Sequence, residues 1–269
     1  MARVLGILTN DPSLLRCQAA RLEPSITFPE DEVLGLGSFD DTDVLLARRP
    51  ASVGTRRLPA LVEGLQSPAL LAMSRREVIY QEENIHPLKF RGWLFAMDAE
   101  SELLTKVREA IEASLPLFLA RSLRTVTSGE RVFFLFLREL HEQNQLDDPN
   151  LEASEVARSL ARSLRAVDEF LARAGETRPV DFAALATNGR VLVGARRGRP
   201  LAYLLGEGSG ACSLCGLDER SDDPRVSTHR RGRFVALASI PSAQSGFLEV
   251  PDRSVIAVSR SLQINVASL

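Results

Sequence analysis

Apolar residues follow two different spacings along this chain of 269 residues, and the order of the two spacings constrains the fold strongly. Short apolar runs bounded by turn residues dominate residues 3–97 and return from Val180 onward, as expected for β-strands. Between residues 101 and 174, apolar side chains recur every three or four positions, as on the buried face of a helix. This order favours two mainly antiparallel sheets covered by helices over a doubly wound parallel sheet.

Turn and capping residues place the individual elements. Asn188-Gly189 between two apolar runs predicts a β-hairpin, and Asp11-Pro12 predicts the start of a helix. Strands are predicted over residues 3–8, 33–39, 44–49, 69–74, 92–97, 182–187, 191–195, 202–205, 234–238, 247–250 and 255–258. Helices are predicted over residues 12–22, 58–65, 101–115, 132–143 and 151–174. The last helix is amphipathic, so it is either an outer layer of the fold or a face for a partner.

The composition argues against several classes of protein. Apolar residues make up 45% and charged residues 25% of the chain, which is typical of a soluble globular protein. Because 33 basic residues are nearly balanced by 35 acidic ones, no nucleic-acid partner is predicted. No apolar run approaches the roughly 18 residues of a membrane span, so no membrane association is predicted. Without a signal-peptide pattern or a disulfide framework, a cytoplasmic location is expected.

Six segments in the first half of the chain resemble one known family in order and spacing. They are Ala2–Gly6, Gly35–Gly37, Leu71–Arg75, Glu83–Pro87, Trp93–Ala96 and Glu130–Leu137. These segments resemble the class II glutamine amidotransferases of the N-terminal-nucleophile hydrolase fold, particularly the stand-alone group that includes γ-glutamyl-peptide hydrolases. The resemblance implies one domain over residues 2–269, with the α/β architecture of a four-layer α/β/β/α sandwich.

Position 2 departs from the family pattern. In this family the nucleophile is the cysteine that follows the initiator methionine, and its own α-amino group acts as the base. The corresponding residue here is Ala2. Since a methyl group cannot attack an amide carbonyl, the resemblance implies that the nucleophile has been lost.

The motif that forms the oxyanion hole also departs from the pattern. The family uses an asparagine amide and a glycine N–H in a Phe-Ala-His-Asn-Gly motif, whereas this chain has Phe95-Ala96-Met97-Asp98-Ala99. An ionised Asp98 has no donor and would repel a developing oxyanion. Ala99 also lacks the backbone freedom of glycine.

Two further positions hold the substrate in the family. A Thr-Asp-Ser-Glu motif binds the α-amino group, and alignment on Glu130 places Ser128, which carries no negative charge, at the aspartate position. The arginine that binds the substrate α-carboxylate is retained as Arg75. We expect Arg75 to pair with Asp98 across the vacated pocket; the alternative is that it binds a small carboxylate or amino-acid ligand.

Losses in three separate motifs predict a catalytically inactive protein that acts as a binding, regulatory or scaffold subunit for a protein partner of unknown identity. Two alternatives remain open. The first is an active glutamine or γ-glutamyl amidohydrolase whose N-terminal cysteine has been replaced by Ala2. The second is a sensor of a small carboxylate in the vestigial glutamine pocket, with Arg75, Asp98 and Ser128 on its walls.

The remaining chemistry-bearing residues are assigned structural roles. His86 is expected in the loop beneath the pocket. Cys212-Ser213-Leu214-Cys215 needs two further ligands to form a zinc site, and the nearest candidate, His229, lies outside that motif while Cys17 is distant in sequence. We therefore predict two reduced thiols in a turn, with no metal and no cofactor. A metal site at Cys212, Cys215 and His229 is the alternative.

The sequence also contains two clusters of basic residues. Arg196-Arg197-Gly198-Arg199 is expected at the tip of a hairpin, and a second cluster covers Thr228–Arg233. Because acidic residues such as those of Asp218–Asp223 lie close by in sequence, both clusters are expected to be solvated loops rather than anion-binding patches.

Overall fold

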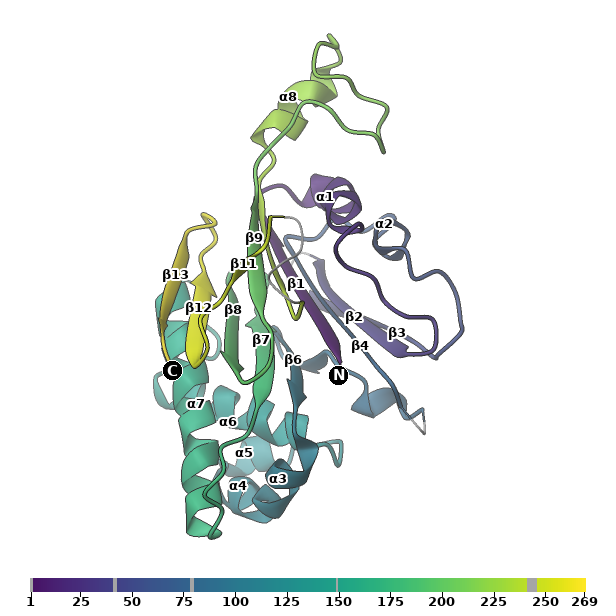
Figure 1. Ribbon diagram of the computed structural model, residues 1–269. Coiled ribbons are helices and arrows are strands. Elements are labelled where there is room, and N and C mark those ends of the chain that lie inside the picture. Colours follow the sequence, from purple (N-terminus) through teal and green to yellow (C-terminus); the bar gives the residue numbers. More distant parts are fainter. Residues whose placement is uncertain (1, 41–42, 78–79, 149, 241–245) are drawn as a thin grey trace.

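Two antiparallel sheets lie face to face in the computed structural model, which describes residues 2–40, 43–77, 80–148, 150–240 and 246–269 (Figure 1). The first sheet has the strand order β11-β9-β10-β1-β4-β2-β3, and the second has the order β13-β12-β8-β7-β6-β5. The strands of the first sheet are β1 (Arg3–Thr9), β2 (Val33–Asp40), β3 (Asp43–Arg49), β4 (Ala69–Arg75), β9 (Ala202–Gly206), β10 (Phe234–Ala238) and β11 (Leu248–Glu249). Those of the second are β5 (Leu88–Phe90), β6 (Trp93–Ala99), β7 (Phe182–Thr187), β8 (Leu192–Arg197), β12 (Ser254–Val258) and β13 (Ile264–Ser268).

Helices cover the outer face of each sheet (Figure 1). The first sheet is covered by α1 (Leu15–Leu22) and α2 (Leu58–Leu61). The second is covered by α3 (Ser101–Lys106), α4 (Arg108–Ser114), α5 (Leu117–Ala120), α6 (Ser128–Glu142) and α7 (Ala153–Arg173). The last helix, α8 (Pro224–Arg231), lies beyond the end of the first sheet (Figure 1). Short 3-10 turns occur at Pro12–Leu14 and Glu82–Asn84.

Strand β6 illustrates how the sequence sets these layers. Its residues Trp93, Phe95 and Met97 pack in the core beneath the helices. The intervening Leu94 and Ala96 pack in the core between the two sheets. Because successive side chains of a strand point to opposite faces, burial of both faces requires the continuous apolar run observed here. The predicted four-layer α/β/β/α sandwich is confirmed.

The predicted strands are present with ends shifted by at most two residues, but other predictions need correction. The helix predicted over 101–115 is divided between α3 and α4, because Val107 leaves helical geometry with φ −109° and ψ 8°. The long helix predicted over 151–174 packs as an outer layer, α7. Strands β5 and β13 were missed, and none of the described helices has the length and apolar character of a membrane-spanning segment.

The basic run Thr228–Arg233 was expected to be a solvated loop, but most of it belongs to α8. Asp223 caps this helix by accepting a hydrogen bond from the Arg225 N–H, and Pro224 occupies the first turn. Val226 is its only buried residue among those described, so no apolar period marked the helix.

Candidate functional site

A pocket lies where the ends of the two sheets meet, at the N-terminal end of β1. Because β4 runs antiparallel to both β1 and β2, Arg3 lies opposite Ser74 and Val33 lies opposite Arg75. The C-terminal end of β6 and the first turn of α6 complete the walls. The volume of about 740 Å³ is in the range of pockets that bind small molecules.

The residues predicted from the sequence come together in this pocket. Its lining includes Ala2, Arg75, Asp98, Ala99 and Ser128. Charged lining residues that sequence analysis missed are Glu32, Arg76, Glu77 and Arg199. Nothing in their local sequence distinguishes them from surface charges. Each lines the pocket only because the fold places its strand or loop there.

Ala2 is held firmly at the pocket end of β1. Its side chain is buried, and it packs in the core between the sheets. The adjoining backbone is bonded to Ser239: the Val4 N–H donates to Ser239 Oγ at 2.8 Å, and the Ser239 N–H donates to the Val4 carbonyl at 2.9 Å. Position 2 therefore has a defined place in the site, and it presents a methyl group there.

Asp98 is paired with Arg199 rather than with the predicted partner, Arg75. Arg199 Nη1 donates to Asp98 Oδ2 at 2.8 Å, and both side chains are mostly buried. Arg75 instead forms an ion pair with Glu77, and both of these side chains are partly exposed. The predicted Arg75–Asp98 pair was wrong because Arg75 lies on β4 of the first sheet, whereas Asp98 and Arg199 belong to neighbouring parts of the second.

The basic cluster that contains Arg199 was expected to be a solvated loop, and this expectation was wrong. Arg196 donates to the Val250 carbonyl at 2.9 Å and pairs with Glu249. Arg197 binds Asp168 through two hydrogen bonds of 2.7 Å each, which joins β8 to α7. Both arginine side chains are almost completely buried, and they join β8 of the second sheet to α7 and to the β11 segment of the first sheet.

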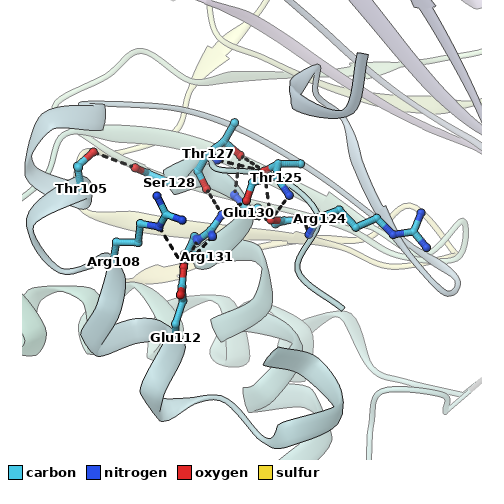
Figure 2. A network of polar contacts seen from close by, with 9 residues as sticks. All are labelled: Thr105, Arg108, Glu112, Arg124, Thr125, Thr127, Ser128, Glu130 and Arg131. Carbon is cyan, nitrogen blue, oxygen red and sulfur yellow. Dashed lines mark hydrogen bonds and ion pairs between the residues drawn. The ribbon is translucent and has the colours of Figure 1, made fainter. Parts of the chain in front are cut away.

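Ser128 lies in the first turn of α6, whose start is fixed by its neighbours. Thr127 caps the helix by accepting a hydrogen bond from the Glu130 N–H. The buried Glu130 carboxylate accepts hydrogen bonds from the N–H groups of Arg124 and Thr125 at 3.0 and 2.9 Å (Figure 2). These contacts tie the preceding loop to the helix, so Glu130 positions Ser128 from behind the pocket wall.

The buried Arg131 guanidinium supports the same turn. Arg131 donates to Glu112 Oε1 on α4 at 2.7 Å and also pairs with Glu130 (Figure 2). The Arg131 hydrogen bonds are the first cause of the lowered pKa of Glu112, ahead of burial, which opposes the shift. Ser128 Oγ contacts Thr105 Oγ1 of α3 at 3.4 Å (Figure 2). The wall of the pocket is thus braced by three helices.

His86 lies directly beneath this turn. A Cβ atom at Gly129 would come within 2.7 Å of His86 Cε1, so glycine is required for the close approach. Burial lowers the pKa of His86 to about 3, and the positive charges of Arg75 and Arg48 act in the same direction. The ring is therefore neutral near pH 7, and it is one of the residues that line the pocket.

The chemistry available at the front of the pocket follows from these groups. The Ala2 methyl is not a nucleophile, and the Asp98 carboxylate offers no N–H to a developing oxyanion. The lining carries charges of both signs: Arg75 and Arg199 are positive, and Glu32 and Glu77 are negative.

The remaining candidates lie at the opposite end of β1. Cys212, Cys215 and His229 are close together there, and Cys17 of α1 lies beside them. Cys17 was not expected at this site because it is distant along the chain, but the antiparallel pairing of β1 with β10 brings the two regions together.

No protein-family model and no curated protein matches the chain in sequence. Solved structures do match it over its whole length. A glutamine aminotransferase class-II domain protein from Silicibacter pomeroyi matches with a TM-score of 0.60 and 18% identity, covering 99% of this chain and 98% of that one. A predicted glutamine amidotransferase from Pseudomonas aeruginosa matches with a TM-score of 0.55 and 15% identity, covering 100% and 96%. This chain has the class II glutamine amidotransferase fold.

The same amidotransferase fold occurs within a longer protein. The glutamine phosphoribosylpyrophosphate amidotransferase of B. subtilis, solved in complex with ADP and GMP, matches with a TM-score of 0.56 and 14% identity. The match covers 99% of this chain but 49% of that one. At these identities the similarity concerns the fold alone, and the site must be judged from its own residues.

Proposed function

We propose that this protein is a catalytically inactive variant of the amidotransferase fold that acts through binding, as a regulatory or scaffold subunit. The observation that carries the proposal is the methyl group of Ala2 at the pocket end of β1. In the resemblance described above, this is the position of the nucleophile. Acyl transfer needs a nucleophile that can attack the carbonyl carbon, so its loss removes the first step of the reaction.

The ion pair of Asp98 with Arg199 supports the same proposal. A carboxylate already bonded to a guanidinium at 2.8 Å occupies the position at which the resemblance expects an oxyanion donor. Two separate requirements for amide cleavage are thus missing from one pocket. A protein with such a site acts by what it binds, so a protein partner and a cytoplasmic location, where the three free cysteines would stay reduced, form part of this proposal.

A direct assay tests the proposal. The purified protein is incubated with glutamine and with a series of γ-glutamyl peptides, and the release of ammonia, glutamate or the leaving amine is measured. We expect no release above the rate without protein. Turnover that scales with protein concentration, and that persists after a further purification step, would overturn the proposal in favour of an active amidohydrolase.

A second candidate function is the sensing of a small carboxylate or amino acid. The observation that favours it is the open volume of about 740 Å³ beside Arg75, whose side chain is about one-third exposed. Arg75 is already bonded to Glu77, so a ligand carboxylate would have to replace that partner or share the guanidinium with it.

Thermal shift and calorimetry with amino acids and dipeptides test this second function. A ligand that binds the native state raises the melting temperature, and R75M is expected to abolish the rise. R173M, at an exposed position on α7, is the matched control and should leave the rise unchanged. Absence of any ligand-dependent rise across the series would exclude the sensor while leaving the scaffold function in place.

A further inference from the structure

Four potential metal ligands from distant parts of the chain converge at the end of the first sheet that lies opposite the pocket. They are Cys17 on α1, Cys212 and Cys215 in the connection between β9 and α8, and His229 on α8. Their ligand atoms all lie within 4.8 Å of one another, and the Cys17 and Cys215 sulfurs are 3.4 Å apart. Tetrahedral zinc with Zn–S bonds of about 2.3 Å would place two sulfurs about 3.8 Å apart, so the cluster has the dimensions of a metal site.

The turn that carries two of the cysteines is preformed. Cys212 and Leu217 exchange two backbone hydrogen bonds of 3.0 Å, and Gly216 between them has φ +66°. The turn therefore holds the two cysteines close together before any metal binds.

His229 presents a free lone pair to these sulfurs. Its Nδ1 lies 2.9 Å from the Arg225 carbonyl, and since a carbonyl can only accept, Nδ1 carries the proton. Nε2 is then an acceptor, and it is buried without a hydrogen-bond partner. A metal-bound imidazole has this arrangement, in which the second ring nitrogen donates to a carbonyl and fixes the orientation of the ring.

The 207–233 segment has little hydrophobic core of its own. The segment contains few apolar side chains; Leu217 and Val226 are buried, whereas Leu214 is exposed. Figure 1 shows α8 and its flanking loops extending from the body of the protein above α1. Small segments that cannot bury enough apolar surface are commonly stabilised by a metal or by disulfides.

We propose that Cys17, Cys212, Cys215 and His229 bind a structural zinc ion that fastens the 207–233 segment to α1. Three thiolates and one imidazole form a soft ligand set that selects zinc, and four protein ligands leave no open position for catalysis. A disulfide between two of the cysteines would leave the third thiol unused. It would also leave His229 Nε2 without a partner.

Metal content tests the proposal directly. The full chain is purified under reducing conditions without chelators, reconstituted with Zn²⁺ and desalted, and zinc is counted by mass spectrometry. We expect about one zinc ion per chain, and a loss of roughly tenfold or more in C212S/C215S. A zinc content equal to that of the double variant would overturn the proposal, and so would a Cys17–Cys215 disulfide in protein prepared without oxygen.

Histidine variants separate coordination from a general loss of folding. H229Q should weaken zinc binding roughly tenfold or more, whereas H229C should retain zinc because a fourth thiolate replaces the imidazole. H141Q, on the exposed face of α6, is the matched control and should keep the full zinc content. Failure of H229C to bind more zinc than H229Q would contradict a ligand role for this position.

The fastening role has a readout of its own in the unaltered protein. Chelation of zinc should accelerate tryptic cleavage at arginines of the 207–233 segment by roughly tenfold or more, because the segment then opens locally. Cleavage within α7 should not change. An unchanged rate at 207–233 would contradict the proposed cross-link.

Discussion

Arg199 donates to the Asp98 carboxylate at 2.8 Å, with the two side chains 19% and 13% exposed. This pair lies in the wall of the pocket and joins the loop after β8 to the end of β6 across β7. The ionised Asp98 carboxylate carries no hydrogen to donate to a substrate, and its ion pair with Arg199 gives it a structural role in the pocket wall. The pair therefore stabilises the pocket wall and also limits the chemistry that the pocket can perform.

A double-mutant cycle should detect this interaction. D98N and R199Q each leave a mostly buried partner without its ion pair, and we expect a coupling free energy of about 1–3 kcal/mol from urea unfolding of the single and double variants. The exposed pair of Arg173 with Glu169 is the control and should give about 0.3–0.5 kcal/mol. Equal coupling in the two cycles would contradict the structural importance of the Asp98–Arg199 pair.

Restoring a thiol at position 2 should not restore activity. A2C, with removal of Met1 verified by intact mass, is expected to hydrolyse glutamine no faster than the unaltered protein, because Asp98 still offers no donor to the oxyanion. The matched variant A2C/D98N/A99G supplies both a thiol and an amide donor. Turnover by A2C alone would instead favour the alternative that Ala2 replaced the cysteine of an active enzyme.

His86 should make folding sensitive to acid. Its pKa is about 3 in the folded chain and about 6.5 when unfolded, so below pH 6.5 the unfolded chain takes up a proton that the folded chain does not. Its contribution to stability is complete above pH 6.5 and is lost as the pH falls toward 3. Between pH 7.5 and 5.0 we expect H86Q to lose about 2 kcal/mol less unfolding free energy than the unaltered protein. Equal losses by urea denaturation would count against a buried neutral ring.

The contact of His86 with α6 gives an independent check. G129A places a methyl group 2.7 Å from His86 Cε1, and we expect it to reduce the unfolding free energy by about 1–3 kcal/mol. G92A, in a turn where a Cβ meets no atom within 4 Å, should change it by less than about 0.5 kcal/mol. Unfolding midpoints that do not distinguish G129A from G92A would show that the ring does not pack against this turn.

Much of the fold was predictable because its determinants are local. The run Trp93–Met97 alternates between two cores, and the spacing of Phe133, Phe136 and Leu140 follows one helix face; both patterns arise from the repeat of the backbone itself. Helix α8 escaped prediction because it buries a single apolar residue, Val226, although Asp223-Pro224 marked its start.

The sequence alone indicated that the chain alternates between strand and helix periods, and it suggested through a family resemblance which positions, 2, 98, 99 and 128, to inspect in the pocket. The tertiary structure decided which charges meet, pairing Asp98 with Arg199 and Arg75 with Glu77. It also brought Cys17 next to Cys215, although 198 positions separate them in the chain. The physical reason is the separation of the residues along the chain. Apolar periodicity reflects the backbone geometry of residues that are near in sequence, whereas ion pairs and ligand clusters join residues that only the packing of the sheets brings together.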